Sequence, residues 1–304
     1  MAAPLFLLAP PRSYTSLINA MIGQHPQAFG VPELCLFNKE RLVDLWSGID
    51  DESADRATRR RHGLLRAVAE IYCGEQTSAA TNMARAWVAA REDWATERVY
   101  RELVDKLDPL VVVDKSPSYA IAVWRMQAIH RAFPEARFIH LVRHPIAQCK
   151  SVMELKEGAF CVRMGAFELH EDYGTMEPQI AWHDINLTIL EFLEGVPAEQ
   201  QFRILGEDLI ADPRTKLGEI TRWLGWRDDD AAIEEMMHPE RSPFACFGPV
   251  DALFGNDPKF LAGPTFRPHK PTVPKMDAPL PWRTDGKGLY PQVVSLACEL
   301  GYEH

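Results

Sequence analysis

The fold is decided by residues 5–19, which read LFLLAPPRSYTSLIN. Leu5 to Ala9 form an apolar run with the length and character of a buried strand. Residues 10–14 break this run, and from Thr15 to about Gly23 the apolar residues recur at helical spacing. We therefore expect a strand, a short loop and a helix, the opening unit of a parallel α/β sheet.

Further apolar runs alternate with helical patterns along the rest of the chain. The runs read LVVV at 110–113, RFIHLV at 137–142 and QFRIL at 201–205. The expected helices are most of 39–106, about 119–132, the segment from Pro145 past Ser151, 213–225 and about 291–300. This order predicts a single α/β domain over residues 1–304, with a central, mainly parallel sheet flanked by helices.

Residues 238–283 differ from the rest of the chain because they are rich in Pro and Gly and have weak periodicity. Irregular segments of this length usually have a function of their own. We expect a mobile segment that becomes ordered when a ligand binds.

Composition limits the classes of partner. The chain has 33 Lys and Arg against 43 Asp and Glu, a net charge of −10. This balance argues against binding nucleic acid or an anionic membrane surface, since both depend on basic surface. The first apolar stretch is too short for a signal peptide, and no run approaches the ~20 residues of a membrane span. We expect a cytoplasmic protein that does not bind membranes.

The loop after the first strand has the composition of an anion site. In parallel sheets ligands bind beyond the carboxyl ends of the strands, where a helix N-terminus offers free N–H groups. Arg12 adds a guanidinium there, and Ser13, Thr15 and Ser16 add hydroxyls. The same hydroxyl residues also suit a plain helix cap, and this segment alone leaves both interpretations open.

A nucleotide-dependent kinase is one alternative for such a loop. Its phosphate loop reads G-x-x-x-x-G-K-[ST], with the last hydroxyl on magnesium. The chain has no glycine between Ala9 and Ile22, and Arg12 stands where the kinase pattern has Lys. The loop therefore does not favour a kinase.

A second anion site is indicated by Arg143 and Ser151. Arg143 ends the run at 137–142, and Ser151 follows eight residues later on the expected helix. A guanidinium fork and a hydroxyl brought together there would hold a second phosphate. An Arg before a helix is more often a surface residue, but the first loop beside it favours the site.

These segments together resemble the sulfotransferases that use 3′-phosphoadenosine-5′-phosphosulfate (PAPS). Residues 9–17 resemble their 5′-phosphosulfate loop, and residues 138–151 resemble their 3′-phosphate motif. Residues 206–225 are similar to a later signature of the family, so the resemblance follows most of the chain in order.

Within this family, the resemblance is nearest to the sulfotransferase domains of bacterial polyketide and olefin pathways. It depends on residues 32–34, 114–119 and 255–261, and the last of these looks like a mobile active-site flap. Such domains sulfate a β-hydroxyl of an acyl chain on a carrier protein. The resemblance thus implies either this acceptor or a small alcohol or phenol.

The resemblance also implies PAPS as donor and adenosine 3′,5′-bisphosphate as product. No metal is expected, because a transferring sulfuryl group carries less negative charge than a phosphoryl group. The residues implied in binding PAPS are Arg12, Ser13, Tyr14, Thr15, Ser16, Arg143 and Ser151. Tyr14 stands where the family commonly has Gly, and Leu17 or Gly206 stands where it often has an adenine-stacking aromatic. The groups that hold adenine remain open.

Three residues are candidates for the chemistry. Glu33, which aligns with the acidic base of carrier-type sulfotransferases, is the expected base for the acceptor hydroxyl. Lys115 is expected to stabilise charge on the leaving phosphate, and Arg12 to steady the phosphosulfate. Glu33 and Lys115 also fit as ordinary surface residues.

Histidine is the base in many cytosolic members of this family. The candidates are His25, His140, His144 and His269. A protein that binds a nucleotide or carrier protein without catalysis is the remaining alternative.

Overall fold

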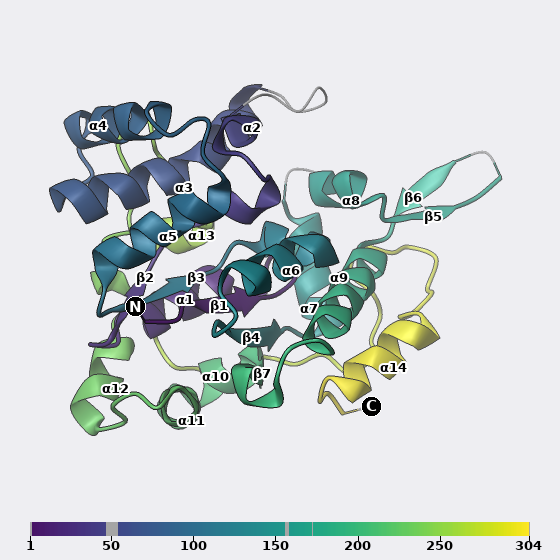
Figure 1. Cartoon of the computed structure of the whole chain (residues 1–304). Coiled ribbons are helices and arrows are strands. Elements are labelled where there is room, and N and C mark those ends of the chain that lie inside the picture. The colour runs from purple at the N-terminus through teal and green to yellow at the C-terminus, as the bar shows by residue number, and fades with distance from the viewer. Residues whose placement is uncertain (1, 47–53, 156–157, 172, 304) are drawn as a thin grey trace.

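The computed structural model describes residues 2–46, 54–155, 158–171 and 173–303 (Figure 1). Its centre is a five-stranded sheet in the order β2–β3–β1–β4–β7. The strands are β1 (Leu5–Leu8), β2 (Ala28–Gly30), β3 (Val111–Asp114), β4 (Arg137–Val142) and β7 (Gln201–Leu205). All neighbouring pairs are parallel, so their carboxyl ends meet at one edge. The predicted α/β fold is confirmed.

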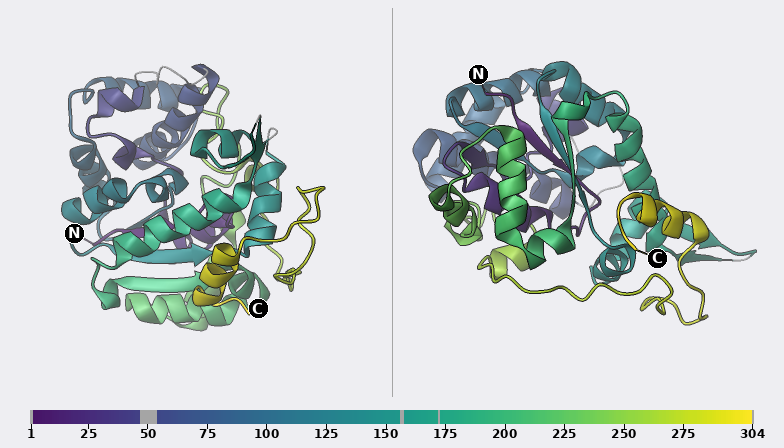
Figure 2. Two further views of the ribbon diagram at one scale, coloured as in Figure 1. Left: turned by 90° about the vertical axis from the view of Figure 1, so that its right-hand side faces the viewer. Right: turned by 90° about the horizontal axis from the view of Figure 1, so that it is seen from below.

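Helices cover both faces of the sheet (Figures 1 and 2). Phe6 and Leu8 of β1 face a core shared with helices on one side, whereas Leu5 and Leu7 face the opposite core. Because β1 is central and buried on both sides, its sequence is continuously apolar rather than alternating. The helices of the first layer are α3 (Ala54–Cys73), α4 (Ser78–Ala89), α5 (Thr96–Leu107), α6 (Val123–Ala132) and α9 (Pro178–Leu193).

The opposite layer contains the helix of the opening unit. Its members are α1 (Thr15–Gly23), α11 (Pro213–Leu224) and α12 (Asp230–Met236). The remaining helices are α2 (Leu42–Trp46), α7 (Pro145–Met153), α8 (Ala159–Met164), α10 (Gly206–Ala211), α13 (Pro258–Ala262) and α14 (Pro291–Glu299). None of the described helices is both long and apolar enough to cross a bilayer.

Two segments lie outside the layers. An antiparallel hairpin of β5 (Phe167–Leu169) and β6 (Gly174–Met176) projects from the body (Figure 1). Between α12 and α14 the chain is mostly irregular, with α13 and a 3₁₀ turn at Pro239–Arg241 as its helical parts. From α13 to α14 this segment runs along the surface (Figure 2, right). The irregular structure expected for residues 238–283 agrees with this course, and its mobility stays a prediction.

Some elements escaped the sequence patterns. Strands β2, β5 and β6 have three residues each, too few to form an apolar run. Helix α6 begins at Val123 rather than near Tyr119, because a 3₁₀ turn at Pro117–Ile121 precedes it.

Candidate active site

The loop between β1 and α1 has an unusual backbone. Arg12 and Tyr14 have φ angles of 71° and 60°, in the left-handed region that side chains rarely adopt. Ser13 between them is completely buried. Left-handed residues other than glycine are costly and concentrate at functional sites, so this loop is built for a purpose beyond connection.

The two predicted anion-binding clusters are in direct contact. Arg12 Nε donates a hydrogen bond to Ser151 Oγ at 3.1 Å, and Arg143 Nη1 donates to the carbonyl oxygen of Arg12 at 2.5 Å. Helix α7 is held to the loop because Gln148 Nε2 donates to the carbonyl oxygen of Pro11 at 2.7 Å. The clusters therefore form one continuous site at the carboxyl end of β1 and β4.

A cavity of about 470 Å³ opens at this site. Six predicted residues line it, namely Arg12, Tyr14, Thr15, Ser16, Arg143 and Ser151, whereas Ser13, Glu33 and Lys115 do not. The sequence patterns missed two further cations on its wall, Lys150 and Lys259, and an apolar part that includes Leu17, Phe260 and Pro264. The cavity thus combines cationic groups with a patch of apolar surface.

Several groups at the site suit an oxyanion. Among the described residues, Arg143 Nε and Ser13 Oγ are buried and have no hydrogen-bond partner. A buried donor without a partner is costly, and a phosphate or sulfate oxygen would satisfy it. Burial, and then the charge of Arg143, lower the pKa of Arg12. These groups fit the phosphates of PAPS.

Carboxylates balance part of this charge. Asp257, just before α13, forms an ion pair with Arg12, and its backbone N–H donates to Ser16 Oγ at 3.1 Å. Glu154 pairs with Lys259 at 2.9 Å. Asp257 is 245 positions from Arg12, so no local pattern could link the two; its place in the motif at 255–261 was the available signal.

Glu33 and Lys115 form an ion pair at the carboxyl ends of β2 and β3. Lys115 Nζ lies 2.5 Å from Glu33 Oε1. The Lys115 side chain is 1% exposed and that of Glu33 is 35% exposed, so the carboxylate borders solvent while the ammonium lies below it. A proton acceptor reachable from outside thus touches a buried cation.

The backbone of Glu33 is clamped between two glycines. Its N–H donates to the carbonyl oxygen of Gly255 at 2.8 Å. A Cβ atom on Gly63 of α3 would lie 2.0 Å from the carbonyl oxygen of Glu33, and one on Gly255 would lie 2.9 Å from Gly63 Cα. Gly255 also has a φ of 119°. A side chain at 63 would require the Glu33 loop to move, and one at 255 would have to displace the backbone of Gly63.

Asp114 lies fully buried beside Lys115. Its carboxylate accepts hydrogen bonds from Ser116 Oγ at 3.0 Å and from the Tyr119 hydroxyl at 3.2 Å. Burial raises the pKa of Asp114 to about 7, although these hydrogen bonds and Lys115 act in the opposite direction. Ser116 Oγ also accepts from the backbone N–H of Cys35 at 3.1 Å, which connects the Glu33 loop to the end of β3.

The four candidate histidines do not line the cavity. His25 stacks on Trp226 at the far end of α1. His140 of β4 is hydrogen-bonded to Asn186 of α9. His144 packs edge-on against Tyr302. Burial lowers the pKa of His140 and of His144 to about 4, so both are neutral at pH 7. His269 lies exposed in the irregular segment.

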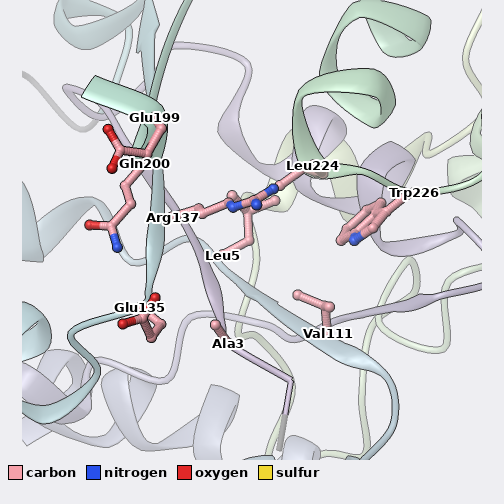
Figure 3. A pocket seen from close by; sticks show the side chains of 9 residues that line it. All are labelled: Ala3, Leu5, Val111, Glu135, Arg137, Glu199, Gln200, Leu224 and Trp226. Atoms are coloured by element: carbon pink, nitrogen blue, oxygen red, sulfur yellow. The ribbon is translucent and has the colours of Figure 1, made fainter. Parts of the chain in front are cut away.

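A second cavity, of about 360 Å³, opens at the opposite, amino end of the sheet (Figure 3). Leu5, Val111 and Arg137, the first residues of β1, β3 and β4, contribute to its wall together with Trp226. Arg137 Nη1 donates to the carbonyl oxygen of Trp223 at 3.0 Å. The predicted site residues all lie away from this cavity.

Comparison with known proteins agrees with the geometry at the carboxyl end. A family model described as the sulfotransferase family matches residues 4–230, most of the chain. The chain belongs to the sulfotransferase family. This sulfotransferase is 25% identical over 186 residues to heparan sulfate glucosamine 3-O-sulfotransferase 6 of Homo sapiens, covering 58% of the chain and 52% of that protein. The chain thus spans about half the length of that relative.

Two solved structures match the entire sulfotransferase chain. The sulfotransferase domain from the curacin biosynthetic pathway has a TM-score of 0.79 and 23% identity, and the match covers 100% of this chain and 99% of that one. The domain from the Synechococcus PCC 7002 olefin synthase has a TM-score of 0.73 and 24% identity, with coverage of 100% and 97%. At these identities the likeness establishes the fold. The family and relatives indicated by the sequence are confirmed.

Proposed function

We propose that this sulfotransferase moves a sulfuryl group from PAPS to a hydroxyl of its acceptor. The observation that carries the proposal is the contact between Glu33 and Lys115 at the same sheet edge as the cationic cavity. Strand β1, which leads to Arg12, is the neighbour of β3, which leads to Lys115. The donor-binding groups and the acid–base pair therefore follow adjacent strands.

The donor's two ends would be held by the two clusters that meet at Arg12. Arg143 and Ser151 suit the 3′-phosphate, since Arg143 has an unpaired buried Nε and Ser151 lies at the cavity wall. Arg12, with the hydroxyls of Ser13, Thr15 and Ser16 and the free N–H groups of α1, suits the 5′-phosphosulfate. Asp257 would give up its contact with Arg12 when the phosphosulfate binds.

In the proposed step, the acceptor oxygen forms a bond to sulfur as the bond from sulfur to the 5′-phosphate oxygen breaks. Glu33 accepts the acceptor's proton. The negative charge left on the phosphate is stabilised by Lys115 and Arg12, and adenosine 3′,5′-bisphosphate is released. The sulfuryl group carries less charge than a phosphoryl group, so these cations are sufficient without a metal ion.

The acceptor is proposed to be a small alcohol or phenol, or a β-hydroxyl on a carrier-bound acyl chain, in the cytoplasm. The resemblance of residues 32–34, 114–119 and 255–261 to the sulfotransferase domains of bacterial polyketide and olefin pathways supports the carrier-bound class. The half-length match to a heparan sulfate enzyme is weaker support for a sugar acceptor.

The decisive test is transfer of ³⁵S-labelled sulfate from PAPS to a panel of alcohols, phenols and β-hydroxyacyl carrier proteins. We expect one acceptor to gain the mass of one SO₃, with equal rates in EDTA and in magnesium. Activity that requires magnesium and ATP would favour a kinase instead. Tight binding of adenosine 3′,5′-bisphosphate with no transfer to any acceptor would favour a non-catalytic binder.

A further inference from the structure

Tyr14 and Gly206 are far apart in the sequence but in contact in the fold. A Cβ atom placed on Gly206 would lie 2.7 Å from Cδ2 and 3.3 Å from Cε2 of the Tyr14 ring. Real Cβ atoms do not approach a neighbour this closely, so the ring occupies the space of a side chain at 206. Tyr14 belongs to the loop after β1, whereas Gly206 begins α10 after β7.

The backbone does not explain glycine at this position. Gly206 does not have a positive φ, and it begins an ordinary helix. The other near neighbour of its missing Cβ is the carbonyl oxygen of Val142 at 3.4 Å, an ordinary contact. The space taken by the Tyr14 ring is therefore what excludes a side chain at 206.

Tyr14 in turn occupies a position that suits glycine. Its φ of 60° lies in the left-handed region, and its side chain makes no capping hydrogen bond to α1. A tyrosine is retained there at a conformational cost. Its ring must therefore make a contact that glycine would lose.

That contact is with Arg143. The guanidinium carbon of Arg143 lies 4.2 Å from the centroid of the Tyr14 ring, the geometry of a cation–π stack. Stacking uses the face of the guanidinium and leaves its N–H groups, which lie in the plane, for hydrogen bonds. One of these, Nη1, reaches the carbonyl of Arg12, and Nε is buried without a partner in the described structure.

We propose that Tyr14 is a positioning residue that orients the Arg143 fork toward the 3′-phosphate of the donor, and that Gly206 is required by its ring. The proposal rests on the function proposed above. The two departures from the family pattern, Tyr14 and Gly206, are then linked. The Tyr14 ring, which follows β1, fills the space that a side chain at 206, after β7, would occupy.

The test measures binding by calorimetry with two probes, adenosine 3′,5′-bisphosphate and adenosine 5′-phosphosulfate, which lacks the 3′-phosphate. Tyr14→Gly removes the ring without straining the backbone, and Tyr14→Phe keeps the ring as the matched control. We expect Tyr14→Gly to weaken the bisphosphate roughly tenfold, the scale of a desolvated cation–π contact, and the phosphosulfate less than about twofold. Tyr14→Phe keeps the ring but loses the hydroxyl, which also interacts with Arg143, so its affinity for the bisphosphate should lie closer to that of the wild type than to that of Tyr14→Gly.

A double-mutant cycle tests the role of Gly206. Gly206→Ala should displace the ring and weaken the bisphosphate about as much as Tyr14→Gly does. In the Tyr14→Gly background the same Ala should have no further effect, because the ring is gone.

The outcomes are distinguishable. Equal losses for both probes, unchanged binding in Tyr14→Gly, or additive effects in the cycle would overturn the positioning role while the proposed function stands. A wild-type protein that binds neither probe would overturn the proposed function, and this inference with it.

Discussion

The two ends of the central sheet are both hollowed, yet they differ in which buried polar groups lack a partner. At the amino end, Arg137 donates to a backbone carbonyl, Glu199 also lines the cavity, and the buried lining atom without a partner in the described structure is an acceptor, Gln200 Oε1. At the carboxyl end, Arg143 and Ser13 keep buried atoms without partners in the described structure. The volumes, about 360 and 470 Å³, are similar. Unpaired donors at strand ends, and not cavity size, therefore distinguish the site.

The largest expected effect is on catalysis at the carboxyl end. Glu33→Gln keeps the side chain's shape but removes the proton acceptor, and we expect turnover to fall by roughly 10²- to 10⁴-fold. Binding of adenosine 3′,5′-bisphosphate should be unchanged. The matched control is Glu199→Gln at the amino-end cavity, which should retain wild-type turnover. Equal turnover in the two variants would remove Glu33 from the mechanism.

The second-largest effect is expected on nucleotide affinity, which a substitution at the carboxyl end should lower and one at the amino end should not. Arg143→Ala removes charge-assisted hydrogen bonds worth about 1.5–3 kcal/mol, so affinity for adenosine 3′,5′-bisphosphate should fall roughly tenfold to a hundredfold. Arg137→Ala is the control at the amino end. It should unfold at a lower temperature because it loses its bond to Trp223, but bind the nucleotide normally. Wild-type affinity in a folded Arg143→Ala protein would show that the phosphate site is assigned incorrectly.

A pH-dependent effect is expected from Asp114. Its pKa is raised by burial from 3.8 to about 7, so the folded protein binds a proton between these values more tightly than the unfolded chain does. Stability from this group is thus present at low pH and declines as the pH rises toward 7. The wild type should lose thermal stability relative to Asp114→Asn between about pH 4 and 7. Parallel melting curves across this range would contradict the assignment.

The smallest effect is expected from Asp257. Asp257→Asn removes the charge that pairs with Arg12, so nucleotide affinity should rise a few-fold, an effect that added salt should reduce.

If residues 255–261 form a flap, their amide exchange should slow when the bisphosphate binds to the wild type. Identical exchange with and without ligand would count against a flap.

Much of the fold could be predicted because buried parallel strands have continuous apolar sequences. Strands β1, β3 and β4 overlap such runs, whereas β7, at the edge of the sheet, is only partly buried and has the mixed sequence QFRIL. Strand β2 could not be predicted from three residues. A Cβ on Gly23 would lie 2.5 Å from Gly30 Cα, and this close approach is visible only in three dimensions.

The candidate site could be predicted where its residues come directly after the strands. Arg12, Lys115 and Arg143 each come soon after an apolar run, and parallel strands bring such residues to one edge. The contacts of Asp257 with Arg12 and of Tyr14 with Gly206 join distant segments, so no periodic pattern encodes them. The burial of Asp114 likewise depends on Tyr119 and Ser116, which enclose it only after folding.

The glycine clamp on Glu33 has a consequence for redesign of this enzyme. The carbonyl of Glu33 lies against Gly63 of helix α3, and the N–H of Glu33 is bonded to the carbonyl of Gly255, so the loop has no room to shift toward α3. Libraries aimed at new acceptors should therefore leave residues 63 and 255 untouched and vary the side chains around them. A side chain at residue 63 would displace Glu33, the proposed base, before it enlarged any entrance.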